Sequence, residues 1–388
     1  ALPVRLRLAA NGPAEAVALR LEADGADARL EAQGQLDAGA GRLQGSLTLR
    51  HPGAVRLLGQ LGWTDADWLG PGSLSAILSG SLQPGQATAE NLELVAGALR
   101  LRGQGGLAWD GPRPRVTGRL SAERLPLPAI PTRSLAPLAL DDRARFDAEL
   151  SVAAEAVELP GLPVLTAATA TLRGAEGAWQ LDGLRGRVAG GEVQATLDLA
   201  AQAVPTLGFE GRLTGGVISA PLTGGTLDLT AGAVEGAWRL RSRGSSPAAL
   251  IANLEGEAAV TLRDAVATGV DVPAIAAAGE ERVAFLADAA LRAAMVGGAT
   301  PLDRAALRLA LRHGIATLDG TELTAEGGAA ATLGGALDLL RGTLDLRLAV
   351  PLPNGPDVAL RLFGAAVDPL RVPEIAARLR FLAEHPPP

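Results

Sequence analysis

The side chains that most often carry catalysis are sparse in this chain and form no recognisable catalytic arrangement. Cysteine is absent, which excludes disulfides, thiolate catalysis and cysteine-ligated metals. The three histidines, His51, His313 and His385, lie far apart, and none has a second histidine or a glutamate at the spacing of helical metal ligands. No Gly-x-Ser-x-Gly nucleophile motif occurs. We therefore expect no catalytic residue, no metal and no cofactor, and a protein that is not an enzyme.

Two acidic pairs and one glycine-rich stretch match functional motifs only in part. Asp65 with Asp67, and Asp141 with Asp142, lack the further oxygen ligands that a calcium loop supplies at regular offsets, so we interpret them as solvated turn residues. Residues 39–45 come close to a dinucleotide-binding loop, but the stretch is one residue too long and a strand follows it. We interpret that stretch as a hairpin turn.

The strongest signal in the chain is an apolar face that repeats every second residue. This period is typical of half-buried strands. Its clearest members, and our candidates for the lining of a lipid groove, are Leu197, Leu199, Leu207, Phe209, Leu213, Leu227, Leu229, Leu344, Leu346 and Leu348. A face of this length must be covered, either by a second sheet or by the curling of the sheet around an apolar interior.

Periodicity alone does not say what fills such an interior. If the curl is open, acyl chains are its natural occupants, because each buried methylene contributes about 0.8 kcal/mol. A dry interior packed by the protein's own leucines and alanines fits the pattern equally well. Alternation also leaves open which face of each strand lines the interior.

The pattern along the whole chain predicts a mainly β protein. Turn signals such as Asn11-Gly12 separate roughly two dozen short alternating segments. A glycine-led strand, a turn and a second strand recur at residues 97–126, 190–221 and 327–351. We predict a long curled antiparallel sheet, shaped as a groove and built from repeated hairpins, with a few short helices.

Four helices are expected among these strands. They are residues 52–61, residues 248–254, residues 280–296 and a final amphipathic helix that begins near Pro373. The second of them interrupts the strands after Pro247 and should cap one end of the curled sheet. Trp63 and Trp68 flank a polar loop after the first helix, and we expect both to plug the sheet beside it.

A proline-rich segment divides the expected domains. Residues 125–143 cannot form a central strand, because proline lacks the N–H group that a ladder needs, and we predict a linker there. The domains are then an N-terminal β-repeat segment at 1–124, a C-terminal β-groove domain at 144–370, and a terminal helix with a proline tail at 371–388.

Charge and hydropathy argue against nucleic-acid binding and against a membrane-spanning helix. The net charge is −7 and no basic run exceeds two residues, so nucleic acid is not an expected partner. No window of about 18 uncharged apolar residues exists, so no segment is expected to span a bilayer as a helix.

Several short motifs occur in an order that resembles the C-terminal region of AsmA-family proteins. The helix at 247–254 between two strands is followed by Gly269-Val270-Asp271-Val272, Thr300-Pro301-Leu302-Asp303, His313-Gly314-Ile315-Ala316, residues 334–339, residues 358–364 and Asp368-Pro369. The likeness covers roughly residues 146–370, and residues 43–127 look like an upstream family repeat. Leu302 stands where phenylalanine is usual, and Asp264-Ala265 stands where Asp-Gly is common.

This resemblance implies a periplasmic protein of a Gram-negative bacterium, held to the inner membrane by an N-terminal helix that this chain does not contain. Such proteins look like curled β-sheets with a hydrophobic groove, and they are linked to outer-membrane biogenesis and to phospholipid movement between membranes. We therefore expect a non-enzymatic lipid-transfer protein whose partners are phospholipid acyl chains and the inner membrane. The alternative is a structural or adhesive β-solenoid scaffold of the passenger type, which is disfavoured because the hairpin lengths vary.

Overall fold

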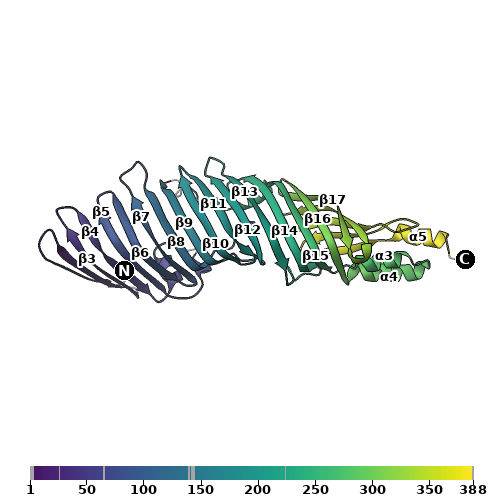
Figure 1. Cartoon of the computed structure of the whole chain (residues 1–388), viewed down its shortest axis with the longest axis horizontal. Coiled ribbons are helices and arrows are strands. Elements are labelled where there is room, and N and C mark those ends of the chain that lie inside the picture. The colour runs from purple at the N-terminus through teal and green to yellow at the C-terminus, as the bar shows by residue number, and fades with distance from the viewer. Residues whose placement is uncertain are drawn as a thin grey trace. The chain divides into compact units, whose positions relative to one another are not determined.

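The fold is that of a mainly β protein, as the computed structural model in Figure 1 shows. The structure describes residues 4–25, 27–63, 66–138, 140, 145–222 and 224–386. These residues form 21 strands, which belong to one open sheet, and five short α-helices. The predicted fold class, a curled antiparallel sheet built from hairpins, is confirmed.

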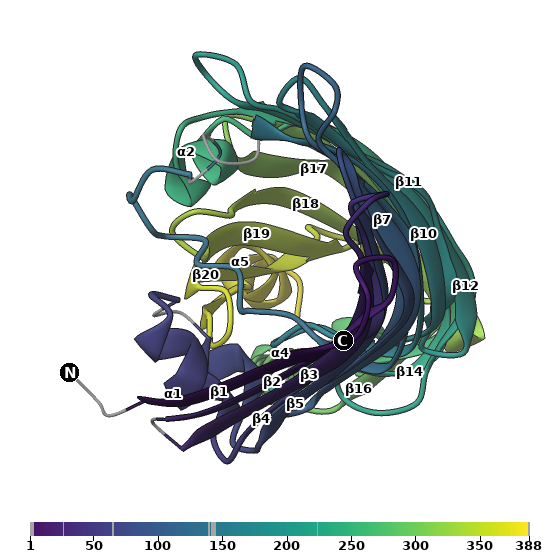
Figure 2. The same ribbon diagram turned by 90° about the vertical axis from the view of Figure 1, so that its left-hand side faces the viewer.

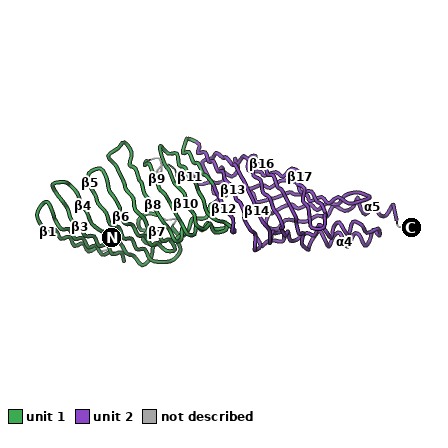
Figure 3. Tube along the Cα trace, viewed as in Figure 1, with its two compact units in different colours: residues 1–130, 139–188, 195–203 green, residues 131–138, 189–194, 204–388 purple. Residues whose placement is uncertain are grey.

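The chain divides into two compact units, coloured separately in Figure 3. Unit 1 comprises residues 1–130, 139–188 and 195–203. Unit 2 comprises residues 131–138, 189–194 and 204–388. One strand, β12 (Gly191–Ala200), contributes residues to both.

Unit 1 is a succession of hairpins. Its strands are β1 (Val4–Asn11), β2 (Val17–Gly25), β3 (Ala28–Asp37), β4 (Arg42–His51), β5 (Leu74–Gln83), β6 (Gln86–Ala96), β7 (Leu99–Ala108), β8 (Arg115–Pro126), β9 (Asp147–Glu158), β10 (Leu165–Ala175) and β11 (Ala178–Val188). Consecutive strands pair antiparallel from β1 through β8, and again from β9 through β11. Alternation therefore places the apolar residues of successive strands on one common face.

Strands β8 and β9 pair in parallel, and the proline-rich segment connects them. Parallel neighbours need a connection that returns the chain to the same end of the sheet. Prolines cannot donate to a ladder, so the connection leaves the sheet before the chain comes back as β9. Pairing thus continues from β8 to β9 on either side of the segment predicted as a linker.

A short helix covers one end of the apolar face of unit 1. Helix α1 (Ala54–Gln60) and the 3-10 turn η1 (Asp67–Leu69) enclose a small core with strand residues. Its buried members are Ala54, Leu57, Ala66, Leu69, Leu74 and Ala96. The expectation that Trp63 and Trp68 plug the sheet is wrong, because Trp63 is 69% exposed and the turn presents Leu69 rather than Trp68 to the core.

Unit 2 continues the hairpin pattern. Its strands are β13 (Thr206–Ile218), β14 (Asp228–Arg243), β15 (Glu255–Thr268), β16 (Ala299–Arg312), β17 (Ile315–Ala325), β18 (Ala330–Asp338), β19 (Thr343–Val350), β20 (Val358–Ala365) and β21 (Leu370–Glu374), with a 3-10 turn η3 (Glu326–Gly328) after β17. Each strand from β13 to β21 pairs antiparallel with the next.

Helix α2 (Pro247–Ala252) joins β14 to β15 and lies at one edge of the sheet of unit 2 (Figure 2). Ser246 caps its first turn, because the Ser246 Oγ accepts a hydrogen bond from the Ala249 N–H at 3.2 Å. The Ala248 N–H donates to the Ser134 carbonyl at 3.0 Å, so part of the proline-rich segment packs against this helix.

The remaining helices fill the C-terminal end of unit 2. They are α3 (Val272–Gly279), α4 (Ala284–Val296) and α5 (Ala376–Glu384). Helices α3 and α4 insert Ile275, Leu291 and Met295, which are fully buried, against strands β19 and β20. Helix α3 was not predicted from the sequence, because its short alanine-rich run is too brief to show a helical stripe. Asp271 is the N-cap residue of α3, because its Oδ1 accepts a hydrogen bond from the Ala274 N–H at 2.9 Å.

Candidate functional site

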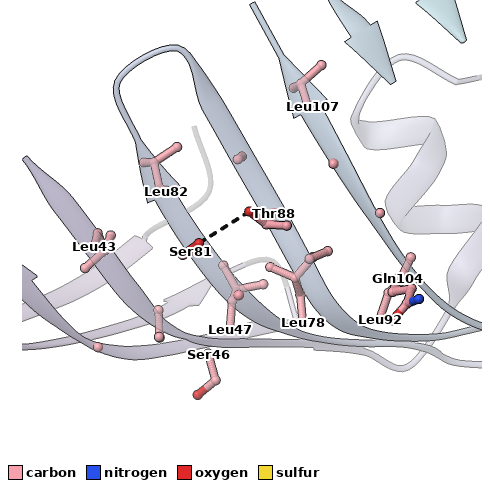
Figure 4. Close-up of a pocket in the computed structure, with 18 of the residues that line it drawn as sticks. Leu43, Ser46, Leu47, Leu78, Ser81, Leu82, Thr88, Leu92, Gln104 and Leu107 are labelled. Carbon is pink, nitrogen blue, oxygen red and sulfur yellow. Dashed lines mark hydrogen bonds between the residues drawn. The ribbon is translucent and has the colours of Figure 1, made fainter. Parts of the chain in front are cut away.

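Unit 1 contains an apolar groove on the inner face of its sheet. It has a volume of about 760 Å³ and crosses nine strands, from Leu8 on β1 to Leu150 on β9. Figure 4 shows the central part of its lining. The larger apolar side chains around it are Leu8, Leu19, Leu21, Leu43, Leu47, Leu78, Leu82, Leu92, Leu107, Val116, Leu120 and Leu150.

Strand register arranges most of these side chains in two walls that run across the strands, whereas Leu19 and Leu150 lie in the row between the walls, opposite Gly34 and Gly118. One wall follows the pairs Leu8–Leu21, Leu21–Ala32, Ala32–Leu47, Leu47–Leu78 and Leu78–Leu92. The other follows Leu36–Leu43, Leu43–Leu82, Leu82–Ala87, Ala87–Leu107 and Leu107–Val116. In β4 the two walls are separated by the residues between Leu43 and Leu47, and in β5 by the residues between Leu78 and Leu82. The walls therefore flank a common floor.

The floor between the walls is made of glycine. We call these residues the glycine line, namely Gly34, Gly45, Gly80, Gly105 and Gly118. The line is continuous in register, because Gly34 pairs with Gly45, Gly45 with Gly80, and Gly105 with Gly118. In β6, between β5 and β7, Ala89 occupies the same row. The floor is therefore almost free of side chains.

No charged side chain lines this groove among the residues that the structure describes. Polar residues alternate with the apolar ones and lie on the other face, where the Ser81 Oγ is 3.4 Å from the Thr88 Oγ1 and Ser46 points away from Leu47 (Figure 4). Without an acid, a base or a nucleophile that is activated by one, the groove lacks the groups that general acid–base chemistry requires. Its surface suits binding of an apolar ligand.

The walls remain partly open to solvent. Leu82 is 45% exposed and Leu107 is 40% exposed, although both sit in the middle of the sheet. A contiguous apolar surface of this kind on a protein usually marks a binding site, because exposing it to water is costly.

The groove candidates predicted from the sequence lie on other strands. Leu197 and Leu199 lie on β12 and are half-buried. In unit 2, Leu348 is 5% exposed and belongs to the core that α3 and α4 close, and Leu227, Leu344 and Leu346 pack against that core. Contact of these four residues with lipid stays a prediction, whereas their contact with the protein's own core is a structural fact.

The other candidates lie on the first strands of unit 2. Leu229 packs against a second core, formed by Ile218, Leu262, Ala265, Leu302 and Ala305. Leu207, Phe209 and Leu213 are half-buried on β13. The ring of Phe209 lies 5.4 Å from that of Trp238.

The groove residues of unit 1 were missed as a set, although the sequence carries a signal for them. Strands β4, β5 and β8 each contain an apolar residue, any residue, glycine, any residue and an apolar residue, as in Leu43-Gln-Gly45-Ser-Leu47. This spacing places the glycine and both apolar residues on one face of a strand. Repetition of the motif in neighbouring strands would have predicted the row.

The residues considered for chemistry in the sequence are scattered. His51 is buried, with its Nδ1 2.7 Å from the Gly53 carbonyl oxygen, and His385 stacks on Phe381 at 4.5 Å between ring centroids. His313 is exposed, with its Nδ1 3.9 Å from a Glu255 carboxylate oxygen. Asp67 begins η1, while Asp65, Asp141 and Asp142 lie outside the described residues. Within the described ranges no three metal-ligating side chains gather.

Shifted pKa values occur on the outer face, in ion pairs between neighbouring strands. A hydrogen bond and the charge of Arg239 lower the pKa of Glu210, whose carboxylate the guanidinium grips at 2.9 and 3.1 Å. A hydrogen bond from Arg361 likewise lowers the pKa of Asp345. These pairs join adjacent strands and are structural.

The fold and the groove define a class, namely an antiparallel β-sheet protein with an uncharged apolar groove along its inner face. Residues 132–321 match the AsmA family. This match confirms the resemblance to the family that was seen in the sequence. Most groove-lining residues of unit 1 precede the matched region.

No curated protein and no solved structure matches the chain. In the part of the chain that the structure describes, none of the helices has the length and apolar character needed to cross a bilayer.

Proposed function

We propose that this chain is a non-enzymatic lipid-binding and lipid-transfer protein of the periplasm. In this role it supports phospholipid transport between the inner and outer membranes, and thereby outer-membrane biogenesis. The observation that carries the proposal is the groove of unit 1, whose lining is apolar, uncharged and partly exposed. The match to the AsmA family is consistent with it.

The dimensions of the groove suit acyl chains. Nine strands at a spacing of about 4.8 Å extend over roughly 38 Å. One acyl chain fills half of a hydrocarbon core that is about 30 Å thick, so it needs about 15 Å. A groove of that length holds more than one chain end to end, and each methylene that leaves water contributes about 0.8 kcal/mol.

Transfer in this proposal is passive. Acyl chains slide along the apolar floor, while polar headgroups stay at the open edge in water. The net charge of −7 disfavours tight capture of anionic headgroups, which suits a conduit rather than a storage site. Attachment to the inner membrane, typical of the family, is part of the proposal.

Substitution of one wall leucine tests the proposal. Leu82→Gln places an amide in the apolar wall, where it has no hydrogen-bonding partner in the ligand, and we expect phospholipid affinity to fall about tenfold. Ser81→Gln is the matched control, because it introduces the same side chain one residue earlier on the opposite face. Titration with a fluorescent phospholipid measures both variants against the unaltered chain.

Lipid should also accompany the purified protein, and extraction followed by mass spectrometry detects it. If the unaltered chain carries no lipid and takes up none, the proposed function is wrong. Equal losses in Leu82→Gln and Ser81→Gln would place the binding surface elsewhere.

A further inference from the structure

The backbone conformation of the residues in the glycine line does not require glycine. None of its five members adopts the left-handed backbone conformation that excludes other residues, in contrast to many turn glycines of this chain. The requirement must therefore come from the surroundings of each residue.

The surroundings are the backbone of the adjacent strand. A Cβ atom on Gly34 would lie 2.6 Å from the Gln44 carbonyl oxygen, and one on Gly105 would lie 2.6 Å from the Thr117 carbonyl oxygen. A Cβ atom on Gly118 would be 2.8 Å from the Gln104 carbonyl oxygen, and Gly45 and Gly80 are equally crowded by the carbonyls of Gln33 and Thr88. Each distance is shorter than a real Cβ contact, and the obstacle is main chain that cannot rotate away. Neighbouring strands thus approach one another closely along this line, on the inner face.

Crowding on the inner face is what a bend produces. When a sheet folds toward one face, the atoms on that face are compressed, and glycine relieves the compression at sheet corners. Figure 2 shows the strands of unit 1 curving around their inner face, from the flat portion of β3, β4 and β5 into an upright portion.

Strand β6 accommodates the bend without a glycine. It carries Ala89 in place of glycine, and there the register slips. Ala89 pairs with Gly105 and Leu92 with Gly103, so β6 has one more residue than β7 across this interval. Such a β-bulge bends a strand and increases its local twist. A bulge at the row where β6 lacks glycine is independent evidence that the strands from β3 to β8 bend there.

We propose that the glycine line is the crease of the unit 1 sheet, and that its glycines are positioning residues for acyl chains. They act through the two leucine walls, which face each other across the floor because the strands bend between them. This inference rests on the proposed function for its ligand and on the backbone geometry for the crease.

The chain offers an adjacent pair of glycines for the test. Gly105 belongs to the line, whereas Gly106 lies on the opposite face, where an added Cβ would have its nearest neighbour at 3.5 Å. Gly105→Ala should force β7 and β8 apart or flatten the bend, and Gly106→Ala should be accommodated. Both substitutions add one methyl group to the same strand, so they differ only in the face that receives it.

The bend can be measured directly. The chain has no cysteine, so Arg115→Cys and Glu123→Cys on the outer face of β8 allow two spin labels to be placed on either side of Gly118. A straight strand would separate the two Cα atoms by about 26 Å over eight residues. Labels on the convex face of a bent strand splay apart, so we expect a distance longer than this straight-strand value in the otherwise unaltered chain, a shorter one after Gly105→Ala, and no change after Gly106→Ala. Phospholipid affinity should fall at least threefold in Gly105→Ala and stay unchanged in Gly106→Ala.

The outcomes separate the crease from the lipid. A straight-strand distance in the otherwise unaltered chain overturns the crease, and this measurement does not depend on the folding of a glycine variant. Equal distances and equal affinities in the two alanine variants overturn it as well. If the distances behave as expected but the unaltered chain takes up no lipid, the proposed function is overturned and the crease is supported.

Discussion

At the scale of single residues, ionisable side chains serve the outer face of the sheet and leave the inner face apolar. Arg239 with Glu210 and Arg361 with Asp345 join adjacent strands, and both carboxylates have a lowered pKa because the arginine donates hydrogen bonds to them. All four side chains are largely exposed, so each pair contributes little to stability by itself.

These lowered pKa values give the stability of unit 2 a pH dependence on the acid side. A carboxylate whose pKa is depressed by folding stabilises the protein above its unfolded pKa, about 3.9 for aspartate, and that stabilisation is lost as the pH falls through the folded value. Asp345→Asn should slightly lower the free energy of unfolding at neutral pH and reduce its decline between about pH 4 and more acidic conditions. Urea unfolding at a series of pH values measures this. An unchanged acid-side slope would show that the pair is not formed in solution.

At the scale of elements, helices α3 and α4 explain why the inner face of unit 2 differs from that of unit 1. Their buried side chains occupy the kind of space that remains open between the walls of the groove in unit 1. Leu348, a groove candidate from the sequence, thereby becomes a core residue.

Truncation on the two faces of α4 tests this role. Leu291 is fully buried, so Leu291→Ala should lower the free energy of unfolding of unit 2 by about 3 kcal/mol, through lost burial and the cavity left behind. Phe285, in the same helix, is 79% exposed, and Phe285→Ala should change it by no more than about 0.5 kcal/mol. Denaturant unfolding followed by circular dichroism compares the two. Similar effects at both positions would argue against the packing of α4 described above.

At the scale of the whole molecule, one repeated hairpin pattern serves two kinds of interior. Unit 1 has an apolar groove that crosses nine strands, and unit 2 has a core closed by its own helices. A ligand that binds only the folded groove stabilises that unit by mass action.

Hydrogen exchange should therefore respond to lipid in one unit only. In the presence of phospholipid, we expect slower amide exchange in β4, β5, β7 and β8, which form the groove, and unchanged exchange in α3 and α4. Mass spectrometry of peptic fragments resolves the two regions. Protection confined to unit 2 would contradict the location of the lipid site.

Much of the architecture was predictable because it depends on local patterns. Period-two alternation predicted the strands, and proline at the first helical position predicted a helix at residues 247–254, which is present as α2 (Pro247–Ala252). The helix predicted at 280–296 is present as α4 (Ala284–Val296). The exposure of Trp63 and the presence of helix α3 were not predictable, since burial of a tryptophan and the stability of a short alanine-rich helix both depend on distant packing partners.

The sequence by itself determined that this protein is a mainly β sheet of repeated hairpins, with one apolar face, no catalytic constellation and AsmA-like motifs. These properties follow from residue types and spacing along single strands. Tertiary structure alone decided which apolar residues line an open groove and which fill a core. Leu82 and Leu348 have the same alternating pattern, but only Leu348 meets helices that the chain brings back from far along the sequence. Alternation sets the phase of a side chain, whereas its cover is set by contacts between segments that the pattern does not relate.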